Sequence, residues 1–401
     1  MIISLKFRHV FPCVVPFLLI LVLTSISLPF IHSRNPYLSK HYDSSTVDID
    51  FQKGIELNST YFNTNYKAKS LDLLIAVTTK HPIVNDLSIL KSSLETWASG
   101  SNFNSADRFM IYSGSSSNVS KSFIHQPALN SRSVTLRQIS WKYSSLNPSL
   151  SSILSKVPLS SMLRNVYKKP TETNQQFPLF WVELKVVRDS DYPALNKNLL
   201  QWEHMSQLTA FKWYLRCDDD AYVNVKLYRE LLLKLDHNKP YYIGKGGYGR
   251  AQEVDLLRIE SKKYALGGFC QVFSAGAQEM VRNCRKSVKK WRQVLGRNHT
   301  HDDVEFGRCM HDQGLSLDEL GLPVIEAFVH VGNPVKKTQP MTTISDKVLR
   351  WKLTRKKVQC PLVVHPVKSP YKMHFIHHLV EQVQLEDHCQ LHSGNHSLLG
   401  F

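Results

Sequence analysis

The chain has 401 residues, of which 42% are hydrophobic and 21% are charged. This composition supports a large buried core and excludes intrinsically disordered, collagen-like and small disulfide-rich proteins. Lys and Arg together number 50 against 33 Asp and Glu, which gives a formal net charge of +17. Such an excess favours an anionic partner, and nucleic acid, an acidic membrane surface, a nucleotide donor and an anionic polysaccharide all meet that description.

The N-terminal region contains a long apolar run. Residues 10–31 include no Asp, Glu, Lys, Arg or His, and a helix of this length can cross a bilayer. We interpret the run as a transmembrane signal anchor, with residues 1–9 in the cytoplasm and the remaining chain in the secretory lumen, as in a single-pass type II protein. A cleaved signal peptide is the alternative, because prolines interrupt the run. The polar residues 32–68 then predict a stem, residues 69–380 a globular domain and residues 381–401 a C-terminal tail.

The cysteines and glycosylation sequences agree with a lumenal location. Six of the seven cysteines follow the apolar run, so up to three disulfides are expected, and no CxxC pair indicates a zinc site. This compartment argues against a nucleic-acid partner. Acceptor sequences for N-linked glycans begin at Asn58, Asn118, Asn298 and Asn395.

Strand and helix patterns alternate from residue 71 onward. Apolar β-rich runs predict strands at 71–78, 108–113, 134–141, 180–187, 212–217 and 241–244, and helical spacing predicts helices at 83–97, 194–209 and 226–235. The serine-rich stretch at 113–161 is expected to be a surface insertion around one of the strands. The alternation predicts an α/β fold with a mostly parallel sheet covered by helices on both faces.

Three successive aspartates, Asp218, Asp219 and Asp220, follow the predicted strand at 212–217. Open α/β sheets bind ligands at the carboxyl ends of their strands. Asp218 and Asp220 can face the same side and offer the hard oxygen ligands that Mn²⁺ or Mg²⁺ prefers, and such an ion can bridge a diphosphate. A solvated acidic turn is the alternative. The position between a strong strand and a strong helix favours a metal site.

The segment 213–223, WYLRCDDDAYV, resembles the DxD segment of the inverting β1,3-glycosyltransferases that include Fringe and the core 1 galactosyltransferase. The similarity is particular to the N-terminal half of chondroitin synthases and to the chondroitin polymerising factor. It extends from about residue 71 to about residue 377 and implies a GT-A (Rossmann-like) domain. Further matches occur in the order of that family: DYP at 191–193, GKGGYG at 244–249, a Gly-Gly pair at 267–268, THDDVEFGRC at 300–309 and VHPVK at 364–368.

This resemblance implies roles for particular residues. His365 is implied to complete the metal site with the two aspartates of the DxD segment, and contacts with the substrates are implied for Asp219, Gly267, Gly268 and Asp302. The glycine-rich run at 244–249 either lets a backbone approach the substrates or is an ordinary flexible loop.

Asp303 matches the catalytic base of the family, the group that takes the proton from the attacking hydroxyl. Because it opens a predicted helix, we expect its carboxylate to be reliably ionised and therefore a weaker base than a buried one. Simple capping of that helix by Asp302 or Asp303 is the alternative.

The implied activity is metal-dependent transfer of a sugar from a UDP-sugar to a glycan acceptor in the Golgi membrane, with Mn²⁺ or Mg²⁺ as cofactor. Glucuronosyl transfer to a chondroitin-type chain is the first choice. The alternatives are galactosyl or N-acetylhexosaminyl transfer to glycoprotein O-glycans, a catalytically silent partner subunit of a glycosyltransferase complex, and a lumenal lectin. Polymerisation by this chain alone is not expected, because the second transferase half of chondroitin synthases does not follow.

Some residues depart from the resembled pattern or lack an assigned role. Glu95, Gln201 and Cys270 stand where the family has a basic residue, a lysine and a small residue, which puts donor choice and donor binding in question. Trp97 fits either the core or the uridine end of a donor pocket. Basic clusters at 282–297 and 347–357 fit solvated helix faces or a guide for an anionic glycan acceptor.

Overall fold

The computed structural model describes residues 47–57, 60–67, 69–79, 87–99, 102–115, 133–143, 178–189, 194–248, 257, 259, 263–295, 301–322, 324–326, 328–330, 341–343 and 361–385. All of them belong to the unit formed by residues 45–401, which is separate from the unit of residues 1–44. The predicted anchor at 10–31, the asparagines of the four glycosylation sequences and the basic cluster at 347–357 lie outside the described residues. Within the described ranges, no helix has the length and apolar character needed to span a bilayer.

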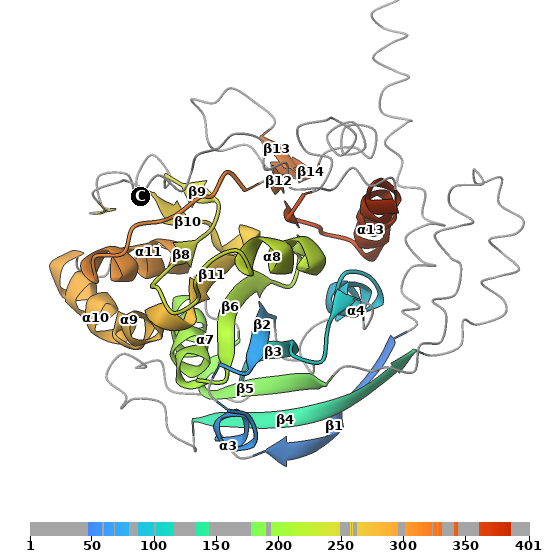
Figure 1. The fold of residues 1–401 in the computed structure, drawn as a ribbon, viewed down its shortest axis with the longest axis horizontal. Helices are drawn as coiled ribbons and strands as arrows, with labels where there is room; N and C mark the ends of the chain where they lie inside the picture. Colours follow the sequence, from blue (N-terminus) through green and yellow to red (C-terminus); the bar gives the residue numbers. More distant parts are fainter. Residues whose placement is uncertain are drawn as a thin grey trace, which may run out of the picture. The chain divides into compact units, whose positions relative to one another are not determined.

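An eight-stranded sheet forms the centre of the fold, in the order β1-β4-β5-β3-β2-β6-β11-β8 (Figure 1). The central neighbours β5, β3, β2 and β6 pair in parallel, and only β4 and β11 run against the other six strands. The predicted, mostly parallel sheet is therefore confirmed. Its strands are β1 (Val47–Leu57), β2 (Leu71–Thr78), β3 (Arg108–Ser115), β4 (Val134–Tyr143), β5 (Leu179–Arg188), β6 (Phe211–Asp218), β8 (Tyr242–Ile243) and β11 (Gln271–Ser274).

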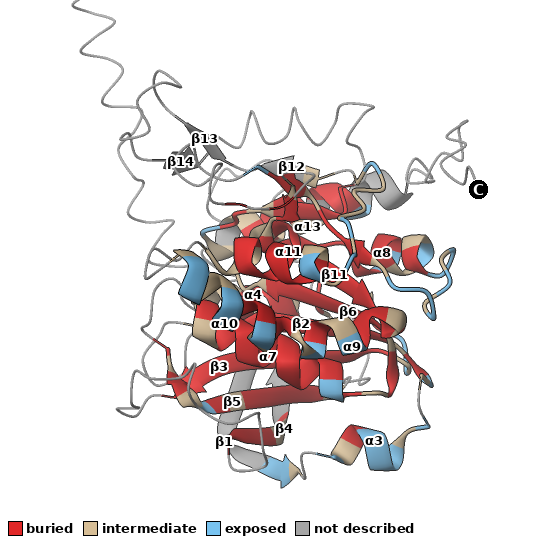
Figure 2. Cartoon of the chain, turned by 90° about the vertical axis from the view of Figure 1, so that its left-hand side faces the viewer, coloured by how far each residue is buried: buried red, intermediate tan, exposed pale blue. Residues whose placement is uncertain are grey.

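Helices cover both faces of this sheet, as its apolar strands require. Successive residues of a strand point to opposite faces, so Leu73 joins one core cluster and Leu74 the other. The Leu73 cluster lies against α4 (Ser88–Glu95), α8 (Val225–Leu232) and α13 (Pro370–Leu385). The Leu74 cluster lies against α7 (Leu195–Gln207), α9 (Gln278–Arg282), α10 (Cys284–Leu295) and α11 (Asp302–Asp312). Figure 2 shows the buried strands between these layers.

Smaller sheets and two short helical turns lie outside the eight-stranded sheet. A three-stranded sheet has the order β12-β15-β7, and two further pairs are β9 with β10 and β13 with β14. The turns η4 and η5 are short 3₁₀ segments. Their bounds are β7 (Tyr222–Val223), β9 (Gly246–Gly247), β10 (Tyr264–Ala265), η4 (Gly267–Phe269), η5 (Ala275–Ala277), β12 (Val324–Glu326), β13 (Phe328–His330), β14 (Met341–Thr343) and β15 (Val363–His365).

The folded domain begins before residue 69, where the sequence placed its boundary. Strand β1 pairs with β4 along the edge of the sheet, and helix α3 (Tyr61–Asn65) follows it. Phe62 of α3 is fully buried, and its ring centroid lies 4.9 Å from that of Phe180 and 5.6 Å from that of Phe211. An edge strand has only one paired neighbour, which explains why the polar composition at 47–57 resembles a stem. At the other end, α13 continues to Leu385, past the predicted boundary at 380.

Replacing Phe62 with alanine tests whether α3 belongs to the domain. Removal of a buried aromatic ring is expected to lower the free energy of unfolding by about 3–5 kcal/mol, as measured by urea denaturation. Val294, which is 63% exposed on α10, supplies the control. The Val294→Ala change is expected to stay within about 0.5 kcal/mol. Equal effects of the two substitutions would exclude α3 from the core.

Candidate active site

The three aspartates leave the sheet at the carboxyl end of β6. Asp218 is the last residue of that strand, and the amide of Ala221 donates to the carbonyl of Asp218 at 3.2 Å, which closes a tight turn. Thr78, the last residue of the parallel strand β2, lies opposite Asp218 in the register. The carboxylates therefore stand at the sheet edge where α/β folds bind ligands.

His365 reaches these carboxylates through the pairing of two short strands. In the antiparallel pair of β15 and β7, Val364 lies opposite Tyr222. Tyr222 follows Asp220 by two positions, so the pairing brings the residue after Val364 beside the aspartate turn. The amide of Val367 also donates to the carbonyl of Asp220 at 2.6 Å, which holds the two segments together.

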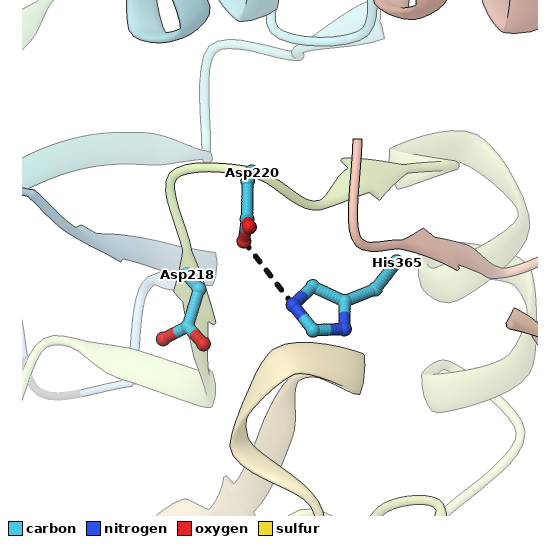
Figure 3. Close-up of side chains that lie close together, drawn as sticks. All are labelled: Asp218, Asp220 and His365. Atoms are coloured by element: carbon cyan, nitrogen blue, oxygen red, sulfur yellow. Dashed lines mark ion pairs between the residues drawn. The ribbon is translucent and has the colours of Figure 1, made fainter. Parts of the chain in front are cut away.

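Asp218, Asp220 and His365 form a compact group of donor atoms that all lie within 4.8 Å of one another (Figure 3). The Nε2 atom of His365 is 3.1 Å from Oδ1 of Asp220, and the side chains of Asp218 and Asp220 are 35% and 11% exposed. Two carboxylates and one imidazole suit a divalent cation such as Mn²⁺, with open positions left for phosphate oxygens and water. The structure thus brings the three predicted metal ligands together.

The pKa values of Asp219 and Asp220 shift in opposite directions. Burial works to raise the pKa of Asp220, but contacts with His365 and Lys368 outweigh it and lower that pKa to about 2. Burial raises the pKa of Asp219 to about 6, against a hydrogen bond of 2.7 Å from the hydroxyl of Thr79. Asp220 is therefore held as an anion, whereas Asp219 accepts a hydrogen bond from the residue that follows β2.

The glycine pair of η4 lies between two groups of the site. A Cβ atom added to Gly268 would lie 2.2 Å from the His365 ring, and one added to Gly267 would lie 2.4 Å from Nη1 of Arg216. Both distances are too short for real atoms, so any side chain here would displace a neighbour. These positions need glycine because of close approach.

Asp303 lies at the start of α11, on the other side of Gly267. Its Oδ1 accepts from the amide of Val304 at 2.9 Å and its Oδ2 from the amide of Gly267 at 3.5 Å. Burial raises the pKa of Asp303 to about 7, and the charge of Asp302 acts in the same direction. The expectation of a reliably ionised carboxylate was therefore wrong, because desolvation outweighs the helix N-terminus. The N-cap residue of α11 is His301, not Asp302 or Asp303.

Arg216 links the candidate metal ligands to α11, although no sequence motif pointed to this residue. The guanidinium is 3% exposed, with Nη2 at 2.9 Å from Asp218 and 3.5 Å from Asp302. Asp302 also accepts a hydrogen bond from Asn198 of α7. Arg216 precedes Asp218 by two residues, and such spacing puts both side chains on one face of a strand. That alternation is the sequence signal that could have revealed the pair.

Two departures from the resembled pattern have structural explanations. Glu95 of α4 accepts a hydrogen bond of 2.9 Å from His374 of α13, so it joins two helices. A buried lysine is present one turn before Gln201 on α7. The ammonium of Lys197 lies 2.9 Å from the carbonyl of Thr79, at the same edge as the aspartates.

Other predicted features lie apart from the three candidate metal ligands. Trp97 is 1% exposed and has its ring centroid 5.7 Å from that of Phe109, which supports the core interpretation. In the glycine-rich run, the amide of Gly246 donates to Glu319 at 3.0 Å. Several cations of the cluster at 282–297 have acidic partners, including Arg285 with Glu203 and Lys290 with Asp312.

Comparisons with known proteins give a family match for the central part of the chain. A family model described as Fringe-like matches residues 188–332. This span contains the aspartate turn, the glycine pair and Asp303, whereas His365 lies beyond it.

Chondroitin sulfate synthase 3 of Mus musculus and of Homo sapiens are each 31% identical to this chain over 140 residues, or 34% of the chain. The matched region is 15% of the length of those relatives. The resemblance to Fringe-like proteins and chondroitin synthases is confirmed by these matches.

Solved structures give a more distant likeness. The galactosyltransferase LgtC, in complex with donor and acceptor sugar analogs, is 9% identical with a TM-score of 0.38, over 78% of this chain and 96% of its own. The glycosyltransferase GlyE of Streptococcus pneumoniae is 9% identical with a TM-score of 0.35, over 79% of this chain and 64% of its own. At these scores the likeness adds nothing to the assignment of the site.

Substitution of Gly268 with alanine is expected to displace the His365 ring and weaken binding of Mn²⁺ by at least about tenfold, since groups that orient metal ligands have effects of this size. Titration calorimetry with Mn²⁺ measures the change. Gly314→Ala is the control: its φ of +77° makes alanine strained, but no atom lies within 4 Å of the added carbon. Unchanged Mn²⁺ affinity in a folded Gly268→Ala protein would contradict the close approach to His365.

Proposed function

We propose that this chain is a metal-dependent, inverting β1,3-glycosyltransferase with a GT-A fold, which transfers a sugar from a UDP-sugar to a glycan acceptor. One observation carries the proposal: Asp218, Asp220 and His365 converge at the carboxyl edge of the sheet, and the half-buried Asp303 lies across the glycine turn from them. Most of this constellation lies within the Fringe-like residues.

The side chains divide the chemistry between them. Asp218, Asp220 and His365 would hold Mn²⁺ or Mg²⁺, which would neutralise the charge on the departing diphosphate. Asp303 takes the proton from the acceptor hydroxyl as that oxygen attacks the sugar carbon from the face opposite the leaving group. A pKa of about 7 makes Asp303 a stronger base than an ordinary aspartate and leaves it partly ionised at neutral pH.

Asp219, Asp302 and the glycine pair would contact the substrates. Asp219 accepts a hydrogen bond from Thr79, the residue after β2, and Asp302 accepts one from Asn198 of α7. Both carboxylates therefore lie where the edge of the sheet meets a neighbouring segment. At Gly267 and Gly268 the space that a side chain would fill is taken by Arg216 and His365, so these glycines would contact the substrates through their backbone.

We further propose glucuronic acid as the transferred sugar and a chondroitin-type chain as the acceptor. The support is the similarity to proteins named chondroitin sulfate synthase. Exposed cations on α9 and α10, such as Lys286 and Lys289, would attract an anionic glycan. Assembly with a second glycosyltransferase would supply the alternate sugar of such a chain.

The proposed location is the Golgi membrane, in type II orientation with the catalytic domain in the lumen. Its support is the apolar run at 10–31 together with two disulfides among the described residues, Cys217 with Cys270 and Cys284 with Cys309. Disulfides of this kind form in oxidising compartments.

The decisive experiment is a screen of common UDP-sugars against a panel of glycan acceptors in the presence of Mn²⁺. The intact chain is expected to transfer glucuronic acid, and Asp303→Asn is expected to lower kcat by at least about 10²-fold. Chelation of the metal is expected to stop turnover, and restored Mn²⁺ to recover it. Absence of turnover with every donor, from a folded protein that binds Mn²⁺, would favour the silent partner subunit. Glycan binding that needs neither metal nor nucleotide would favour the lectin.

Asp303→Asn is also expected to raise the melting temperature at pH 8. The carboxyl of Asp303 has a higher pKa in the folded protein than the value of about 3.9 of an unfolded chain. Its contribution to stability is complete below pH about 3.9 and is lost as pH rises through about 7. A lower melting temperature at pH 8 would show that the loss of activity reflects misfolding.

The pH dependence of kcat/KM supplies a separate test. Ionised Asp303 accepts the proton, so the rate is expected to fall below a midpoint near pH 7. The charged or titratable groups facing Asp303 are Asp302, Arg216 and Tyr242. Because the charge of Asp302 raises the pKa of Asp303, Asp302→Asn is expected to shift this midpoint to lower pH. A midpoint that does not move, with activity retained, would assign the titration to another group.

A further inference from the structure

The disulfide between Cys217 and Cys270 closes the end of a strand pair. In the antiparallel pair of β6 and β11, Gln271 lies opposite Arg216. One position further along each strand are Cys270 and Cys217, whose Cα atoms are 4.3 Å apart. The covalent bond therefore joins the two strands at the point where their backbone pairing ends.

Both chain segments enter the candidate site immediately beyond this bond. In one direction, Cys217 is followed by Asp218. In the other, Cys270 is preceded by the η4 turn, whose Gly268 lies against the ring of His365. The bond thus ties one metal ligand to the turn that contacts another. Both cysteines are fully buried within the Leu73 core cluster, which fixes the bond itself.

Cys270 adopts a backbone conformation that usually requires glycine. Its φ is +63°, in the left-handed region that is unfavourable for residues with a side chain. Cys270 is also a departure from the small residue of the resembled family. A strained residue persists where other interactions compensate for the strain. At position 270 the disulfide with Cys217 is such an interaction, and only a cysteine can form it.

We propose that the Cys217–Cys270 disulfide is a positioning element of the active site, which holds Asp218 and the glycine turn in the geometry that binds the metal. The inference rests on the metal site of the proposed function. When the crosslink is removed, the strand pair that precedes these segments remains, but their covalent link at the entry to the site is lost. The η4 turn can then shift relative to Asp218 and displace the His365 ring that it contacts, so the affinity for the metal falls.

The second disulfide provides a matched control. Cys284 and Cys309 join the start of α10 to the C-terminal half of α11, and both lie in the Leu74 cluster on the opposite face of the sheet. Its removal also takes one buried crosslink from the domain, but it leaves the aspartate turn and η4 tethered to each other.

The test compares two double variants with the unmodified chain. Cys217→Ala/Cys270→Gly removes the crosslink and supplies the residue that suits a φ of +63°, and Cys284→Ala/Cys309→Ala is the control. Mass spectrometry of unreduced peptides first establishes both bonds in the unmodified chain. Thermal unfolding, Mn²⁺ affinity by calorimetry, and kcat and KM at increasing Mn²⁺ are then measured. If the first double variant does not fold, Cys270→Gly alone, with Cys217 as a free thiol, provides the same comparison.

We expect the site variant to bind Mn²⁺ at least about tenfold more weakly, as loss of groups that orient metal ligands does. Saturating Mn²⁺ is expected to restore at least half of kcat. The control is expected to melt at a lower temperature and to change Mn²⁺ affinity by less than about twofold, because its bond touches no metal ligand.

The outcomes separate this inference from the proposed function. A missing 217–270 crosslink, or equal Mn²⁺ affinity in the two double variants, overturns the positioning role while transfer by the unmodified chain upholds the function. Weakened Mn²⁺ binding in the site variant, without transfer by the unmodified chain, upholds the positioning role and overturns the function. An unmodified chain that binds no Mn²⁺ overturns both.

Discussion

Repulsion among three successive carboxylates is the constraint around which the site is organised. Like charges at adjacent positions raise the free energy of the folded chain unless cations or hydrogen bonds compensate them. Each aspartate has its own partners, and the partners come from three different segments of the chain. The partners are Arg216 for Asp218, Thr79 for Asp219, and both His365 and Lys368 for Asp220. A divalent ion between Asp218 and Asp220 would extend the same compensation to the substrate side.

Sequence patterns predicted the parts of this arrangement that depend on local structure. The apolar strand before Asp218 and the period of the following helices suffice to predict an α/β sheet with carboxylates at its edge. The contact of His365 depends on the pairing of β15 with β7, between segments far apart in the chain, so it could be inferred only through a family resemblance. The pKa of Asp303 was misjudged because burial is a property of the folded chain. Strand β1 escaped prediction because one exposed edge permits polar residues.

Three departures from the resembled pattern turn out to have partners in the fold. Glu95 binds His374, Gln201 accepts a hydrogen bond from the hydroxyl of Thr78, and Cys270 is bonded to Cys217. Each substitution is thus matched by a second residue elsewhere in the chain. A single position compared in isolation would suggest a damaged site, whereas each of these side chains makes a defined contact in this fold.

The family match ends at residue 332, but the third donor of the metal group is His365. The matched segment therefore contains the aspartates, the glycine turn and Asp303, the proposed base, but not His365. A match to the family model thus covers only two of the three candidate metal ligands of this chain. For proteins of this kind, the ability to bind a metal has to be judged from the strand that pairs with β7 and not from the DxD sequence alone.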